Sequence, residues 1–228
     1  NEKDAAGLLE VCRDASHLKE WLSRYTPVLA VDCETIKTPE AGVRAGLLIE
    51  GLNPLMYSHV SNADYDDPMF SVCDLVQFGS PPLRADGTPT DDIFDVIDSR
   101  GFLLPGCTYP RAIAVQLIKN HMPIFSKLEL RKVVALLKWV IEGNKCPLVG
   151  TNLGAFDRQV LRANFNAKLK RSRDHLFFAR ARTPDLPKGL KTQGTLFTDV
   201  SRWESTEKGE DSLDGPERVL YAQTDVIV

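Results

Sequence analysis

Five residues that lie far apart in the sequence are of types suited to one chemistry. Asp32 and Glu34 lie in VLAVDCET, Asp157 in VGTNLGAFDRQVL, and Tyr221 with Asp225 in YAQTD. Carboxylate oxygens are the ligands that Mg²⁺ and Mn²⁺ prefer, and the sequence has no compact His and Cys cluster to favour zinc. Two such ions, roughly 3.5 to 4 Å apart, activate a water and stabilise the leaving oxygen at phosphorus. The residue types therefore predict a two-metal site that cleaves phosphodiesters without a covalent nucleophile.

The first and last motifs each place two of these side chains together. The apolar run 28–31 before Asp32 is short and rich in β-branched residues, which predicts a buried strand. Because side chains alternate along a strand, Asp32 and Glu34 share one face, where their charges repel unless a cation lies between them. Tyr221 and Asp225 are four residues apart, so on a helix they also share a face.

Asp157 lies at the junction of a strand and a helix. It follows the strand candidate 147–150 and a short polar turn, and it opens a helical stretch at 158–165. Such junctions often carry functional side chains. By itself Asp157 could be an ordinary helix N-cap, and Asp32 with Glu34 could be a solvated acidic face. The three motifs in this order, each in its expected local structure, favour a common site.

The motifs D-x-E, N-x-x-x-F-D and Y-x-x-x-D, in this order, resemble those of the DEDD (DnaQ-like) superfamily of 3′-to-5′ exonucleases, in its tyrosine-bearing branch. Within that branch they most resemble the proofreading exonuclease domain of family-A DNA polymerases. Those domains more often have two residues between the Asn and the aromatic, whereas three separate Asn152 from Phe156. The stretch CDLVQFGSP, followed by DDIFDVID, resembles the second and third strands of the RNase D group.

The resemblance implies a metal-binding role for each acid of the motifs. Asp32 would bridge two Mg²⁺ or Mn²⁺ ions, Glu34 and Asp225 would complete the site that holds the attacking water, and Asp157 would hold the second ion. Tyr221 would orient this water, because a phenol with a pKa of about 10 is a hydrogen-bonding group and not a strong base.

The resemblance also implies substrate contacts. Thr35 and Asn152 would contact the terminal nucleotide, and Phe156 would pack near its sugar or base. The substrate would be a single-stranded DNA 3′ end, and the product a nucleoside 5′-monophosphate. The implied partner is a family-A polymerase module in the same chain or complex.

Two other functions remain open. One is an RNase D-like exoribonuclease that trims RNA 3′ ends. The other is a non-catalytic module that keeps the exonuclease fold and binds a partner, which the long insertion at 36–70 would favour.

Composition is that of a globular protein. The 228 residues, 43% of them hydrophobic, suit one exonuclease domain with a sizeable core, and we expect it to be a fragment of a larger polymerase chain. A net charge of −3 does not by itself indicate a nucleic-acid binder. The five cysteines are widely spaced, which predicts free thiols in a reducing, intracellular compartment, with a mitochondrion or a nucleoid both compatible. Cys33 is expected to point away from the metals. No stretch has the pattern of a signal peptide or a membrane span.

The expected fold is α/β, an RNase H-like mixed sheet flanked by helices, with the insertion 36–70 after the first motif strand. We expect a helix capped by Ser16 before that strand, and an amphipathic helix at 127–142. The basic run 168–173 is a solvated loop or a contact to phosphates. Further strands are expected at 73–79, 93–97 and 194–200, while 112–118 fits either a strand or a helix.

Overall fold

The structure, a computed structural model, describes most of the chain. The described residues are 9–36, 72–90, 92–119 and 122–182, with the single residues Asp185, Val219, Ala222, Gln223 and Val226. Apart from Ile36, the expected insertion lies outside them, as do the expected strand 194–200 and the motif residues Tyr221 and Asp225. No helix in the described ranges is long and apolar enough to cross a membrane.

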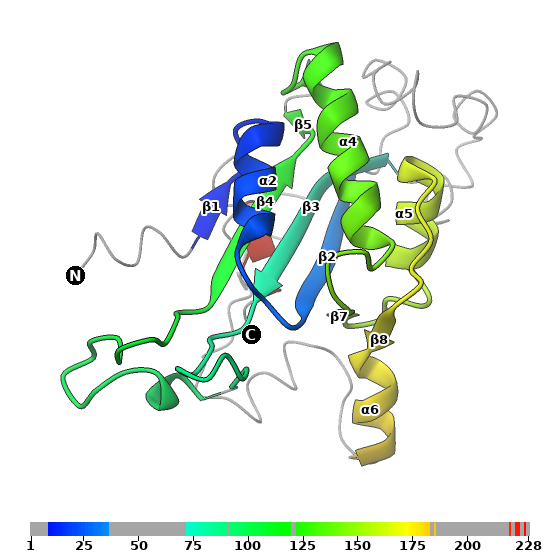
Figure 1. Ribbon diagram of the computed structural model, residues 1–228. Coiled ribbons are helices and arrows are strands. Elements are labelled where there is room, and N and C mark those ends of the chain that lie inside the picture. Colours follow the sequence, from blue (N-terminus) through cyan, green and yellow to red (C-terminus); the bar gives the residue numbers. More distant parts are fainter. Residues whose placement is uncertain are drawn as a thin grey trace, which may run out of the picture.

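A six-stranded mixed sheet forms the centre of the described fold (Figure 1). Its strand order is β1-β4-β3-β2-β7-β8; β3 runs antiparallel to β2 and β4, and the other pairs are parallel. The strands are β1 (Leu9–Val11), β2 (Leu29–Ile36), β3 (Val72–Ser80), β4 (Arg111–Gln116), β7 (Leu148–Gly150) and β8 (Ser172–Asp174). A two-stranded sheet pairs β5 (Ile118–Lys119) with β6 (Met122–Pro123).

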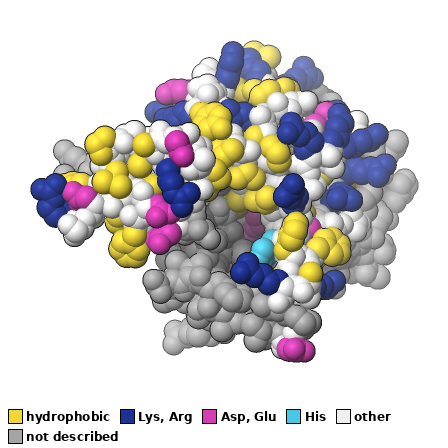
Figure 2. Space-filling model, turned by 60° about the horizontal axis from the view of Figure 1, so that its bottom comes forward, with side chains coloured by type: hydrophobic (Ala, Val, Ile, Leu, Met, Phe, Trp, Pro, Cys, Tyr) yellow, Lys and Arg dark blue, Asp and Glu magenta, His cyan; other side chains and the backbone are white. Residues whose placement is uncertain are grey.

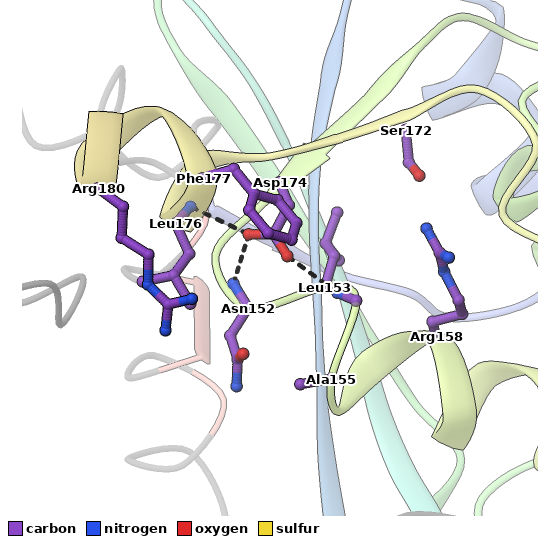
Figure 3. Close-up of a pocket in the computed structure, with 10 residues that line it drawn as sticks. Asn152, Leu153, Ala155, Arg158, Ser172, Asp174, Leu176, Phe177 and Arg180 are labelled. Carbon is purple, nitrogen blue, oxygen red and sulfur yellow. Dashed lines mark hydrogen bonds between the residues drawn. The ribbon is translucent and has the colours of Figure 1, made fainter. Parts of the chain in front are cut away.

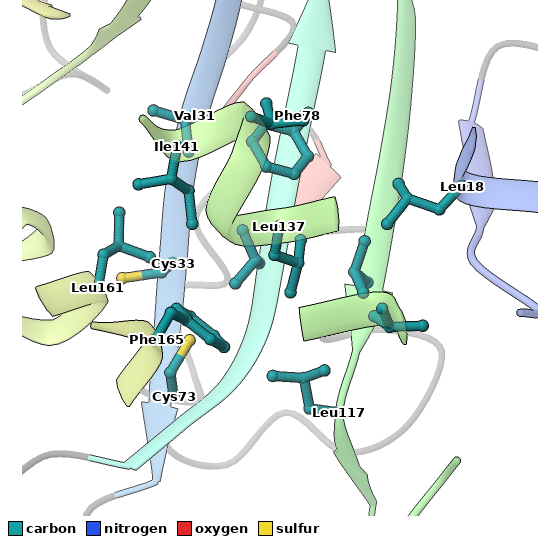
Figure 4. Close-up of a cluster of buried hydrophobic side chains, with 14 of the residues drawn as sticks. Leu18, Val31, Cys33, Cys73, Phe78, Leu117, Leu137, Ile141, Leu161 and Phe165 are labelled. Atoms are coloured by element: carbon teal, nitrogen blue, oxygen red, sulfur yellow. The ribbon is translucent and has the colours of Figure 1, made fainter. Parts of the chain in front are cut away.

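Helices cover one face of this sheet and build the main core. They are α2 (Ala15–Ser23), α4 (Lys127–Ile141) and α5 (Asp157–Phe165), while α6 (His175–Arg182) follows β8 at the sheet edge (Figure 1). Figure 4 shows Phe78 of β3, Leu137 of α4 and Phe165 of α5 within this core. On the opposite face Leu75 and Ala114 pack with Val219 and Ala222. The predicted mixed sheet flanked by helices is therefore confirmed.

Apolar spacing located the longest helix. Leu130, Val133 and Leu137 are buried on one side of α4, and the Ser126 side chain caps its first turn by accepting from the Glu129 N–H. The prediction of a helix at 127–142 is confirmed within one residue. The strand predicted at 73–79 is β3, which is buried along its whole length because both of its faces are covered.

Local polar contacts overturn two expectations. Asp14, not Ser16, caps α2, since its carboxylate accepts from the His17 N–H at 2.7 Å. The segment 93–97 is not a strand but contains a 3₁₀ turn at Ile93–Asp95, where the Phe94 N–H donates to the Asp92 side chain at 2.9 Å. The strand that follows β3 in the chain is β4, so 112–118 is mainly strand. The segment 81–110 between β3 and β4 projects from the sheet as an arm (Figure 1).

Close packing at the end of β7 predicts a strict need for glycine. A Cβ on Gly150 would lie 2.6 Å from the Val31 carbonyl oxygen and 2.8 Å from the Leu153 side chain. We expect Gly150→Ala to lower the free energy of unfolding by about 1 to 3 kcal/mol, as overpacking does, in a urea titration. Gly154→Ala is the control, because its Cβ would make only an ordinary 3.5 Å contact with Asp174. Equal midpoints for the two variants would contradict this account.

Candidate active site

The first two acids share the sheet face that lies away from the helices. Asp32 lies directly opposite Gln77, and Glu34 opposite Leu75, and residues directly opposite in an antiparallel pair point to the same face. Leu75 belongs to the small cluster on the far side of the sheet, whereas Cys33 belongs to the helix-side core. The predicted alternation is therefore present.

A bulge follows these acids. The register of β2 against β3 shifts between Glu34 and Thr35, which leaves Asp74 as the extra residue on β3. Thr35 then lies opposite Cys73, a member of the helix-side core. The structure does not place Thr35 on the face of the two acids.

Asp157 joins the first motif through a gap in the sheet. β7 pairs with β2 only at Leu29 and Ala30, and beyond Ala30 no other described strand pairs with this edge of β2. The Asp157 carboxylate fills the gap: its Oδ1 accepts from the Cys33 N–H and from the Cys33 thiol, both at 3.2 Å. Its side chain also shares a hydrogen bond with Asp32. Two of the four predicted metal acids thus meet in space.

This contact excludes one alternative for Asp157 and defines the surroundings of Cys33. The N-cap of α5 is Phe156, which makes no side-chain cap bond, so Asp157 is not an ordinary N-cap. Cys33 points to the helix side of the sheet, opposite to Asp32 and Glu34, and its thiol donates to Asp157, which approaches from that side; that it points away from the metals stays a prediction. The hydrogen bond with Cys73, and then burial, hold the pKa of the Cys33 thiol well above its usual range, so the thiol stays a donor. All five cysteines are free, as predicted.

The Asp157 carboxyl is buried, with 3% of its surface exposed. Burial raises its pKa, while hydrogen bonds with Cys33 and Asp32 oppose the rise. A buried carboxylate hydrogen-bonded to a second carboxyl is a site where a divalent cation would relieve both desolvation and repulsion. The donor set is all oxygen, which fits Mg²⁺ or Mn²⁺.

Gln77 holds Asp32 from the neighbouring strand. Its Nε2 donates to Asp32 Oδ2 at 2.6 Å, the side chain is fully buried, and its Oε1 has no hydrogen-bond partner within the described residues. Gln77 is not among the site residues predicted from the sequence. The available signal was a polar residue in the middle of the apolar strand VCDLVQFGS.

The loop before Asp157 is fixed by an acid that the sequence analysis also missed. Asp174 accepts from the N–H groups of Asn152 and Gly154 at 2.9 Å and of Leu176 at 3.0 Å (Figure 3). Asn152 has a positive φ of 63°, which Asn tolerates better than most residues, and it is exposed. Phe156 is half-buried and packs against the core.

The final motif lies outside the described residues, but some of its neighbours are placed. Val219 and Ala222 pack with Leu75, on the sheet face that carries Asp32 and Glu34. Within the described residues no group of three or more His, Cys, Asp or Glu side chains is arranged to hold a metal ion.

Comparison with known proteins shows the fold. No family model and no curated protein sequence matches the chain. The catalytic core of RRP6 from Trypanosoma brucei matches with a TM-score of 0.52 at 14% identity, over 96% of this chain and 43% of that one. Escherichia coli RNase D, described as an exoribonuclease involved in structured RNA processing, matches with a TM-score of 0.51 at 11% identity, over 96% and 41%.

The chain thus spans less than half the length of each of these structures. At such identities the likeness shows that the chain has the RNase H-like fold of these exonucleases, as predicted. Neither structure is described as a polymerase, so the likeness does not extend to the family-A branch.

The buried Asp157 carboxyl makes the stability of the metal-free protein depend on pH. Its raised pKa means that its contribution to stability is fully present below the unfolded-state pKa, about 3.9, and is lost as pH rises through the folded-state pKa. We therefore expect Asp157→Asn to raise the Tm in EDTA at pH 7, with a gain that shrinks toward pH 4. Circular dichroism melts across this range measure it.

An exposed acid provides the matched control for this titration. Hydrogen bonds from Thr88 lower the pKa of Asp86, so Asp86→Asn should give no gain at pH 7. A lower Tm for Asp157→Asn than for the wild type in EDTA at pH 7 would refute the assignment.

Asp174 should stabilise the loop and α6 together. Asp174→Ala leaves three backbone N–H groups without their acceptor and should cost about 2 to 4 kcal/mol in urea unfolding. Asp174→Asn keeps one acceptor oxygen and should cost less. Ser172→Ala, on the same strand, is the control and should be nearly neutral; an unchanged midpoint for Asp174→Ala would exclude this role.

Proposed function

We propose that the chain is a metal-dependent 3′-to-5′ exonuclease that shortens single-stranded nucleic acid to nucleoside 5′-monophosphates. Asp32, Glu34, Asp157 and Asp225 are its proposed metal ligands, and Tyr221 positions the attacking water. The observation that carries the proposal is the meeting of the Asp32 and Asp157 carboxyls, from two separate motifs, at the gap beside β2. The fold shared with RRP6 and RNase D supports it.

The described residues act by orienting the two acids. Gln77 fixes one oxygen of Asp32, and the Cys33 N–H fixes one oxygen of Asp157, so both carboxyl groups are held in place before substrate arrives. Two bound Mg²⁺ or Mn²⁺ ions would supply an activated water and stabilise the leaving oxygen. The protein then needs no nucleophilic side chain.

Two substrates are proposed for this site. The motif resemblance favours a DNA 3′ end, with the chain as the proofreading domain of a family-A polymerase and a polymerase module beside it. A second resemblance favours RNA: the LVQFGSP stretch, which contains the Gln77 that holds Asp32, resembles RNase D. Asn152 is exposed at the loop that leads to Asp157, where a terminal nucleotide would meet it.

A cleavage assay tests the function and separates the substrates. The assay incubates 5′-labelled single-stranded DNA and RNA with Mg²⁺, Mn²⁺ or EDTA. We expect a ladder that shortens from the 3′ end, no cleavage in EDTA, and a loss of about a thousandfold in rate for Asp32→Asn and Asp157→Asn, equivalent to about 4 kcal/mol of transition-state stabilisation.

Asp98→Asn, a half-buried acid on the arm, is the control and should cleave like the wild type. Faster shortening of DNA favours the proofreading proposal, and faster shortening of RNA favours the RNase D-like one. No cleavage of either by folded protein with metal would favour the non-catalytic module. Full activity of Asp32→Asn would refute the site.

A further inference from the structure

A cavity of about 540 Å³ lies beside the proposed active site, between the loop before α5 and the start of α6 (Figure 3). Its volume lies within the roughly 300 to 1,000 Å³ of small-molecule sites. Asn152, Arg158, Phe177 and Arg180 are among its lining residues, and Figure 3 shows the two arginines on opposite sides of it. We call it the arginine pocket. None of the roles proposed above uses Arg158, Phe177 or Arg180.

The pocket lies in the most basic part of the chain. Residues 157–182 contain eight Lys or Arg and two Asp, a net charge of +6, although the whole chain has a net charge of −3. Figure 2 shows Lys and Arg side chains gathered on the side away from the projecting arm. A local field of this sign attracts polyanions even when the protein as a whole is acidic.

The charges at the pocket are not neutralised within the described part of the chain. Arg158 and Arg180 are exposed and form no ion pair with any described residue. Asp174, the acid that lines the pocket, already accepts three backbone N–H groups. Among the described residues no acid therefore pairs with these two guanidinium groups, and arginine binds phosphate through several parallel N–H donors.

An aromatic ring completes the pocket. Phe177 lines the pocket and is 64% exposed, so its ring is accessible to a ligand there. Proteins that bind single strands combine a positively charged groove with aromatic side chains on which bases stack. The composition of the pocket thus matches a nucleotide within a strand.

We propose that the arginine pocket binds a nucleotide of the substrate strand upstream of the bond to be cleaved. Arg158 and Arg180 each bind a phosphate of the strand backbone, and the ring of Phe177 stacks on a base. The proposal rests on the proposed function, because Arg158 directly follows Asp157 and the Asn152 loop borders the pocket.

The same chemistry would also suit a free mononucleotide. A strand is favoured because basic residues continue beyond the pocket: Lys168, Lys170, Arg171 and Arg173 are all exposed. A strand of several nucleotides could extend from the pocket along this run, with one phosphate for each nucleotide.

Binding in EDTA tests the pocket without any need for hydrolysis. The experiment measures fluorescence anisotropy of 5′-labelled decanucleotides of DNA and RNA against salt concentration. We expect Arg158→Gln and Arg180→Gln each to weaken binding about tenfold and to reduce the salt slope by about one. Phe177→Leu should weaken binding about fivefold or more through lost stacking. The control is Arg162→Gln, an exposed α5 arginine outside the pocket, which should have a smaller effect than either pocket arginine.

The outcomes separate the pocket from the proposed function. Arginine-dependent binding with no hydrolysis in Mg²⁺ supports the pocket and refutes the exonuclease. The proposed role of the pocket is wrong if its variants bind the decanucleotide as tightly as Arg162→Gln does, whether or not they hydrolyse it. A nucleoside 5′-monophosphate could instead displace the decanucleotide with an affinity equal to that of the decanucleotide itself. If the pocket variants also weakened this binding, the ligand would be a mononucleotide and the proposal of a strand would be wrong.

Discussion

The hydrogen bond from the Cys33 N–H to Asp157 sets the geometry of the proposed site. β7 is too short to pair with β2 beyond Ala30, and a buried N–H without an acceptor would cost about 1 to 3 kcal/mol. Asp157 supplies the acceptor, so a contact that folding requires also brings the carboxyl of the second motif to Asp32. The position of α5 follows, since the helix must begin where this carboxyl can reach β2.

The same contact buries a charge that the fold alone does not favour. Burial raises the pKa of Asp157, and its hydrogen bond with Asp32 joins two acids that would repel when both are ionised. Residues that oppose local stability but are held by their surroundings are typical of functional sites. Two side chains hold these acids in place. Gln77 on β3 donates a hydrogen bond to Asp32, and Asp174 on β8 accepts hydrogen bonds from the loop before Asp157.

Sequence patterns predicted the structure that depends on residues close in the chain. They did not predict contacts that depend on how distant segments pack together. Alternation put Asp32 and Glu34 on one face, and apolar spacing located α4. The support from Gln77 and Asp174 could not be predicted, because it depends on the register of β2 with β3 and on how β8 meets the loop. The segment 93–97 has the apolar content of a strand, but Asp92 binds its backbone and turns it. The roles of Tyr221 and Asp225 remain predictions.

Net charge conceals how the charges are distributed. The arm 81–110 carries five Asp and two Arg, whereas 157–182 carries eight basic residues and two Asp. Figure 1 places the arm on one side of the molecule and α5, β8 and α6, which belong to the basic segment, on the other. A polyanionic strand is repelled by the first and attracted by the second, so the field alone orients it before any contact forms. The strand would then approach Asp157 from the side of the arginine pocket. Its path beyond the proposed active site would be set by the placement of these charges and not by the metal ligands.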